Sequence, residues 1–135
     1  MPAVSGRDAM ISGMAPVLRA GRYVFVSVPG PVPEGLEPIM TFREDEGLTL
    51  ILPQQEADQA DLGYNLVLAW ITLRVHSSLE GVGLTAAVSS ALAESEISCN
   101  VVAAAFHDHL FVPADRADQA VRVLVQLAGA TPADE

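Results

Sequence analysis

Lysine is absent from this sequence, and basic side chains of any kind are scarce. Its seven arginines are outnumbered by 17 acidic residues, which gives a formal net charge of −10 at pH 7. Nucleic-acid binding depends on clustered Lys and Arg side chains that neutralise phosphates, so we expect no nucleic-acid partner. A phosphate-binding loop ending in Gly-Lys-Ser or Gly-Lys-Thr is excluded as well, because it needs the lysine.

Cysteine is limited to Cys99, and long hydrophobic runs are missing. A lone cysteine cannot build an internal disulfide framework, which fits a reducing compartment. The longest apolar run, residues 66–71, is far shorter than a membrane span requires. The first residues lack the basic region and apolar stretch of a secretory signal. We therefore expect a cytoplasmic protein without a membrane partner.

Hydrophobic residues make up half of the chain, so its 135 residues can bury a substantial core. In the N-terminal half, apolar spacing and turn residues predict four features. These are a weak helix over residues 5–18 that Pro16 ends or bends, a strand over 22–28, a hairpin of 39–43 and 48–52, and a short helix over 53–61. The proline-rich residues 29–38 are predicted to form a connection.

The second half has clearer periodicity. Residues 69–76 alternate between apolar and more polar side chains, which predicts a strand with one buried face. A helix is predicted from Gly83, a second strand over 98–106, a turn at 107–109, a third strand over 110–112 and a last helix from Asp115. The order from residue 64 to residue 128 is therefore β-α-β-β-α.

This order predicts an α+β fold of the ferredoxin-like type, with helices on one face of an antiparallel sheet. The first half reads as a degraded version of the same unit. We expect two tandem modules at residues 1–63 and 64–130, followed by a tail at 131–135. Residues 64–75 are long for one strand, and we hypothesise that they serve as the last strand of one module and the first of the next.

Three segments resemble the ACT domain family. Residues 75–88 resemble its strand-to-helix corner, where a glycine and apolar residues open the first helix. Residues 92–94 and 97–101 resemble the end of that helix and the second strand. Residues 106–113, with the corner at 76–80, resemble a small group of uncharacterised bacterial proteins with two tandem ACT-like modules. The usual proline before the glycine is missing, and no fourth strand follows the last helix. Residues 22–28 are the candidate for that missing strand.

The resemblance implies a regulatory protein that binds an amino acid or a similar small molecule near the strand-to-helix loop. The ligand-binding residues that it implies are His76, Ser77, Ser78, Gly83, Leu84 and Asn100, with His107 and Asp108 as further candidates. An independent physical argument points to the same loop. Backbone N–H groups at a helix N-terminus favour a carboxylate, and a glycine lets the ligand approach the main chain.

Other chemistries remain open from the residues alone. His107 and His109 flank Asp108 and could hold a metal, line the ligand pocket or simply form a polar turn. Cys99 could be a nucleophile, but its position on a strand favours burial as a small hydrophobic side chain. Trp70, on the more polar side of its strand, fits either a second layer or a dimer contact.

We expect a protein that is not an enzyme and needs no cofactor or metal. It would bind a small molecule, which the resemblance implies is an amino acid, and act in trans or through oligomerisation, as a homodimer. Two alternatives stay open. One is a structural module that pairs with another protein through its sheet edges. The other is a metal-dependent enzyme that uses the histidine turn.

Overall fold

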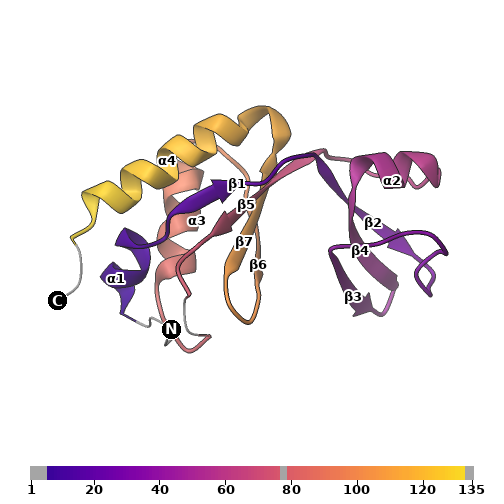
Figure 1. Ribbon diagram of the computed structural model, residues 1–135, viewed down its shortest axis with the longest axis horizontal. Helices are drawn as coiled ribbons and strands as arrows, with labels where there is room; N and C mark the ends of the chain where they lie inside the picture. Colours follow the sequence, from indigo (N-terminus) through magenta and orange to yellow (C-terminus); the bar gives the residue numbers. More distant parts are fainter. Residues whose placement is uncertain (1–5, 77–78, 133–135) are drawn as a thin grey trace. The chain divides into compact units, whose positions relative to one another are not determined.

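The computed structural model describes residues 6–76 and 79–132 and divides the chain into two compact units (Figure 1). The discontinuous unit consists of Met1–Arg19 and Ala69–Glu135, and the inserted unit is Ala20–Leu68. This division differs from the predicted modules at 1–63 and 64–130, because the first 19 residues group with the C-terminal segment. Contacts between segments distant in sequence decide this grouping, and a linear reading cannot detect them.

The discontinuous unit has the predicted α+β composition. Its elements are α1 (Arg7–Ser12), β1 (Pro16–Leu18), β5 (Leu68–Leu73, whose first residue belongs to the inserted unit), α3 (Leu84–Glu94), β6 (Asn100–Ala103), β7 (Asp108–Pro113), a 3₁₀ turn at Ala114–Arg116 and α4 (Ala117–Ala130). The strand order in this unit is β1-β5-β7-β6. Strand β1 therefore occupies the position of the fourth strand that the sequence appeared to lack.

The predicted helix over 5–18 is wrong in its second half, and so is the predicted source of the fourth strand. Helix α1 ends at Ser12, and Ala15 takes a left-handed φ of 43° that redirects the chain. Pro16 then begins β1, which pairs antiparallel with β5 through Pro16–Leu73 and Leu18–Ile71. Residues 22–28 instead form β2 (Tyr23–Val28), which pairs with β4 along its whole length.

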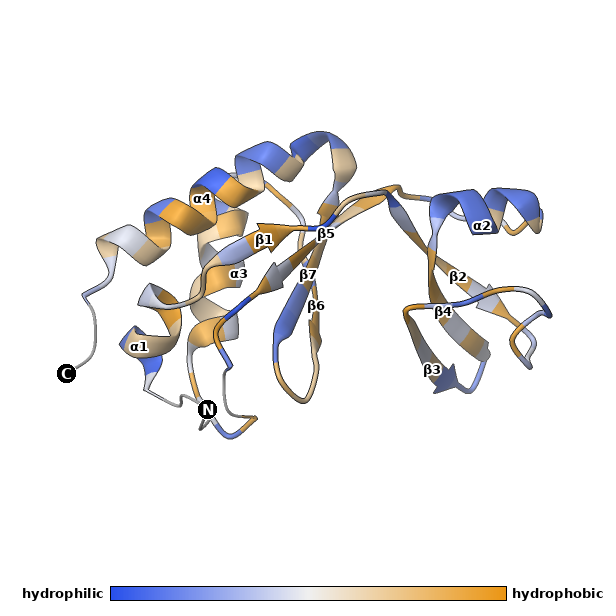
Figure 2. Cartoon of the chain, in the orientation of Figure 1, coloured by the Kyte–Doolittle hydropathy of each residue, from blue (hydrophilic) through white to orange (hydrophobic). Residues whose placement is uncertain are grey.

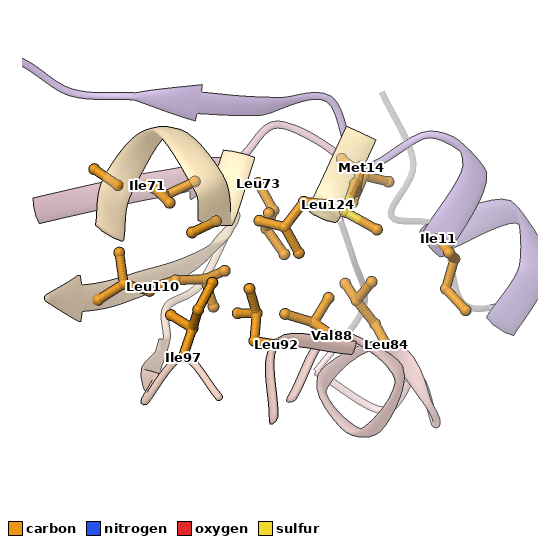
Figure 3. Packing of buried hydrophobic residues seen from close by; sticks show 14 of the residues in the cluster. Ile11, Met14, Ile71, Leu73, Leu84, Val88, Leu92, Ile97, Leu110 and Leu124 are labelled. Atoms are coloured by element: carbon orange, nitrogen blue, oxygen red, sulfur yellow. The ribbon is translucent and has the colours of Figure 1, made fainter. Parts of the chain in front are cut away.

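Apolar side chains from α1, β5, α3, β7 and α4 build the core of the discontinuous unit (Figure 3). Helix α3 contributes Leu84, Val88 and Leu92 at the predicted helical spacing, each at most 3% exposed. Helix α4 adds Leu124 on its apolar stripe, which alternates with polar residues in Figure 2. Burying one such leucine contributes about 1.5–3 kcal/mol, so these helices are held chiefly by their contacts with the sheet.

The inserted unit is a small sheet with one helix. Strands β3 (Met40–Glu44) and β4 (Gly47–Pro53) form the predicted hairpin, and the strand order is β3-β4-β2. Helix α2 (Gln54–Gln59) covers one face, where Ala57 packs among the buried valines and leucines of β2 and β4. Gly47 has no room for a side chain, since a Cβ there would lie 2.7 Å from the carbonyl oxygen of Val28.

The strands of the second half are bounded differently from the predictions. Strand β5 starts at Leu68, which pairs with Tyr23, and its later residues pair with β1, so its pairing is not confined to one unit. Strand β6 is shorter than predicted. Strand β7 begins at Asp108, so the predicted turn at 107–109 is wrong for its last two residues. The turn lies earlier, where the Ala104 N–H donates to the carbonyl of His107 over 3.0 Å.

Candidate functional site

A cavity of about 140 Å³ lies at the N-terminus of α3, within the discontinuous unit. Its lining comes from the start of α3, the preceding loop, α1 and the β6–β7 hairpin. The lining residues are Met10, Leu79, Gly81, Gly83, Leu84, Thr85, Ala103 and Asp108. Three of the predicted ligand-binding residues, Gly83, Leu84 and Asp108, are therefore brought together in one cavity. We call it the α3 cavity.

Gly83 shapes the entrance of the chain into α3. It is the N-cap residue and has a φ of 107°, a conformation that side chains with a Cβ rarely adopt. No described side chain makes a capping hydrogen bond to this end of the helix. The N–H groups of the first turn, which have no partner inside a helix, carry about half a positive charge together with the helix dipole. This end of the cavity is suited to a carboxylate.

Asp108 supplies the opposite charge. It is the first residue of β7, pairs with Ala103 across the hairpin and is 8% exposed. Leu110, two residues further along the same strand, belongs to the core cluster, so both side chains point to the helix side of the sheet. The cavity thus combines a buried carboxyl group with a helix N-terminus.

Arg7 is a neighbour of the site that the sequence did not predict. A Cβ placed on Gly83 would lie 3.0 Å from both Cγ and Cδ of Arg7, so the arginine side chain packs directly on the glycine. Its Nη1 donates to Oδ1 of Asp8 over 2.9 Å, and its side chain is 59% exposed. No local pattern marks this arginine, because the contact joins two distant parts of the sequence.

Other predicted site residues lie elsewhere. Asn100 is exposed in β6; its neighbour Val101 packs against the core, so Asn100 points to the opposite face of the sheet, beside Phe111. Ser77 and Ser78 lie outside the described residues. His76 and His107 are half-buried and belong to a row of rings rather than to the α3 cavity.

That row contains all three histidines. The ring centroids of His76 and His107 are 6.4 Å apart, as are those of His107 and His109, and the Phe106 ring lies 5.2 Å from His76. Over residues 6–76 and 79–132, no group of three or more His, Cys, Asp or Glu side chains is arranged to hold a metal ion.

His109 belongs to a polar network on the face of the sheet away from the helices. Its Nδ1 accepts a hydrogen bond from Nε1 of Trp70 at 3.0 Å and lies 3.0 Å from Oγ1 of Thr72, which accepts from Nε of Arg19. The Arg19 guanidinium also lies 4.6 Å from the centroid of the Trp70 ring. An indole N–H can only donate, so His109 carries its proton on Nε2.

Burial lowers the pKa of His109 below its ordinary value of 6.5, and the charge of Arg19 lowers it further. Trp70 also stacks on Phe111, with ring centroids 6.0 Å apart. Within its own unit, Trp70 therefore packs against an arginine, a histidine and a phenylalanine; a dimer contact at this residue stays a prediction.

Cys99 packs against the core cluster, as predicted. Its burial raises the pKa of the thiol to about 11. A thiolate, rather than a thiol, is the nucleophile in cysteine chemistry. The surroundings of Cys99 therefore favour the interpretation as a small hydrophobic side chain.

Comparisons with known proteins decide the family. Models of the ACT domain match residues 7–69 and residues 66–126. A crystal structure of a Vibrio cholerae protein of unknown function, described as a possible transport protein, is 48% identical, covers 90% of this chain and 94% of its own, and has a TM-score of 0.82. The chain belongs to the ACT domain family. The predicted tandem ACT fold is confirmed.

More distant structures share the fold. An Agrobacterium tumefaciens protein is 18% identical over 84% of this chain and 87% of its own, with a TM-score of 0.69. The regulatory subunit of aspartate kinase from Thermus flavus is 12% identical over 83% of this chain and 95% of its own, with a TM-score of 0.62. No curated protein matches the chain significantly. No helix in the described part is long and apolar enough to cross a membrane.

Within this ACT protein, the α3 cavity lies at the first strand-to-helix loop of the discontinuous unit, after β5 and before α3. This is the loop where the sequence resemblance located the ligand. The ACT models establish the family, and the likeness to the regulatory subunit of aspartate kinase shows a shared fold.

Proposed function

We propose that this ACT protein is a regulatory protein without catalytic activity that binds a small α-amino acid in the α3 cavity. The observation that carries the proposal is that one cavity has a helix N-terminus at Gly83 and the carboxyl group of Asp108 in its lining. An amino acid is a zwitterion, and these two groups complement its two charges.

In this arrangement, the ligand carboxylate accepts hydrogen bonds from the N–H groups of the first turn of α3. The ligand ammonium donates to Asp108, whose carboxylate can accept several bonds at once. Met10 and Leu84 give the cavity an apolar wall for the ligand side chain. The volume of about 140 Å³ is below the range of drug-sized pockets, which favours a small ligand.

We propose that the bound state is passed on in trans or through a homodimer in the cytoplasm. Strands β6 and β3 end the strand order, and sheet edges of this kind pair readily with another chain. A dimer would carry the signal by changing its own stability or its fit to a partner. Light scattering after size-exclusion chromatography tests whether the protein is a dimer, and a monomer at all concentrations would contradict this proposal.

A thermal-shift panel of the L-amino acids tests the ligand proposal. A ligand at a hundred times its dissociation constant stabilises the native state by about 2.7 kcal/mol, so we expect a shift of several degrees with at least one small amino acid. Asp108→Asn should weaken the affinity for that amino acid at least about tenfold, and so reduce the thermal shift, because the ammonium loses its charged partner. Asp45→Asn, which removes the same charge from the hairpin turn of the inserted unit, is the matched control.

Two results would contradict the proposal. One is that no amino acid stabilises the protein, and the other is that Asp108→Asn and Asp45→Asn respond equally. If no amino acid shifts the melting temperature and pull-down experiments recover a constant protein partner, the protein is better explained as a structural module that pairs with that partner.

A further inference from the structure

The inserted unit contains an open groove of about 750 Å³. All nine of its lining residues lie within Ala20–Leu68, so it is a feature of this unit alone and shares no lining residue with the α3 cavity. Small-molecule sites usually have volumes of about 300–1,000 Å³. The groove therefore has the size of a ligand site, and nothing in the proposed function uses it.

The sheet face away from α2 forms the floor of the groove. Ser27, Thr49 and Phe42 lie side by side on β2, β4 and β3, because Thr49 pairs with both of the others. Glu44 follows two residues after Phe42 and so points to the same face. The intervening residues of β2 and β4 point the other way into the core with Ala57 of α2.

The groove has negative charge and no positive charge in its lining. Glu44 is the charged residue among the nine that line it. The Thr49 hydroxyl donates a hydrogen bond to Oε1 of Glu44, which holds the carboxylate on the groove side of the hairpin. The net charge of −10 strengthens the attraction of the whole chain for cations.

Aromatic rings provide the apolar part of the lining. Phe42 is 64% exposed, although it is a large hydrophobic side chain, and Phe25 and Tyr64 also line the groove. Tyr64 packs against the core cluster on the α2 side, and its hydroxyl accepts a hydrogen bond from Nε2 of Gln54 at 2.9 Å and donates to Oδ1 of Asp58 at 2.7 Å. Aromatic faces attract ammonium groups, and an adjacent carboxylate adds a direct ion pair.

We propose that this groove binds an organic cation, namely a primary ammonium group attached to an apolar body. Glu44 accepts hydrogen bonds from the ammonium, while Phe42 and Phe25 pack on the apolar body. An anionic ligand is disfavoured, because it would approach Glu44 without a compensating basic side chain in the lining. The inference goes beyond the proposed function and does not rest on it, since the two sites share no residue and the groove, unlike the α3 cavity, has no helix N-terminus for a ligand carboxylate.

Titration calorimetry on the full chain tests the proposal with two probes of similar shape, 2-phenylethylammonium and the neutral 2-phenylethanol. We expect the cation to bind at least about tenfold more tightly than the alcohol, because only the cation forms the ion pair with Glu44. Glu44→Gln should remove this preference. Glu46→Gln is the matched control, because Glu46 is an exposed residue of the same hairpin that does not line the groove.

A second variant and a spectroscopic readout locate the binding. Phe42→Ser changes an exposed side chain, so the protein should still fold, and it should weaken the binding of 2-phenylethylammonium several-fold. Amide shifts in a ¹H–¹⁵N spectrum should change at Ser27 and Thr49. Equal binding of the two probes, equal effects of Glu44→Gln and Glu46→Gln, or the absence of shifts in the groove would each overturn the proposal. None of these results would alter the expected amino-acid response of Asp108→Asn.

Discussion

At Nδ1 of His109, two neighbouring groups compete with a proton. The Trp70 N–H already donates to this nitrogen, and Arg19 brings a positive charge into the same network through Thr72. A proton on Nδ1 would place two N–H groups against each other. The lowered pKa of His109 therefore follows from geometry as well as from burial.

Replacing Arg19 tests this network. We expect Arg19→Met to raise the pKa of His109, because the substitution removes a nearby positive charge. The pKa is read from the imidazole C–H resonances during an NMR titration. Arg22→Met, which removes the same charge from the inserted unit, should leave the pKa of His109 unchanged. A pKa that does not move in Arg19→Met would contradict the account of the network.

The same group makes stability depend on pH with a definite sign. The folded pKa of His109 is below the unfolded value of 6.5, so the unfolded chain binds more protons in the interval between the two values. The stabilising contribution is therefore fully present above about pH 6.5 and is lost as the pH falls through the folded pKa. Arg19→Met should make this loss smaller.

At the scale of elements, the N-terminal segment is part of the core of the discontinuous unit. Helix α1 contributes Met10 and Ile11, and the following turn contributes Met14, each at most 1% exposed. Strand β1 then adds backbone pairing to β5. The N-terminal segment, which we predicted to belong to the first module, thus completes the core and the sheet of the discontinuous unit.

Truncating one of these side chains measures the contribution of α1. Ile11→Ala should lower the free energy of unfolding of the protein by about 2–5 kcal/mol, because it leaves a cavity in a closed core. Val125→Ala on α4, where the side chain is 54% exposed, should change it by less than about 0.5 kcal/mol. Urea unfolding measures both. If the two variants lost the same small amount, α1 would not belong to this core.

Elements with a long periodic pattern could be predicted from the sequence. The buried face of α3 and the β3–β4 hairpin follow from spacing and turn residues. Strand β1 could not be predicted, because three residues that begin with a proline carry no alternation and their partner is distant in the chain. We predicted a turn where β7 begins at Asp108, because polar residues such as histidine and aspartate are common in turns.

Part of the candidate site follows from the sequence. Gly83 and Leu84 belong to the predicted helix start, and both line the α3 cavity; that they bind a ligand stays a prediction. The contact of Arg7 with Gly83 and the separation of Asn100 from the cavity depend on which segments meet and on which face a strand presents. The tertiary structure sets these contacts and orientations, so they could not be predicted from the sequence.

At the scale of the whole molecule, the two compact units of this ACT protein carry different cavities. The discontinuous unit offers a small cavity with opposite charges, and the inserted unit offers a larger aromatic groove with Glu44. The family and the fold are established by the matched ACT models and by the Vibrio cholerae structure.

The most direct test of the central claim is a ¹H–¹⁵N titration of the full chain with the small amino acid that gives the largest thermal shift. We predict saturable shifts of the amide signals of Gly83, Leu84 and Asp108, and much weaker shifts with the carboxamide of the same amino acid, which cannot present a carboxylate to α3. Saturable shifts confined to other residues, or no saturable shifts with any amino acid at millimolar concentration, would contradict an amino-acid site in the α3 cavity.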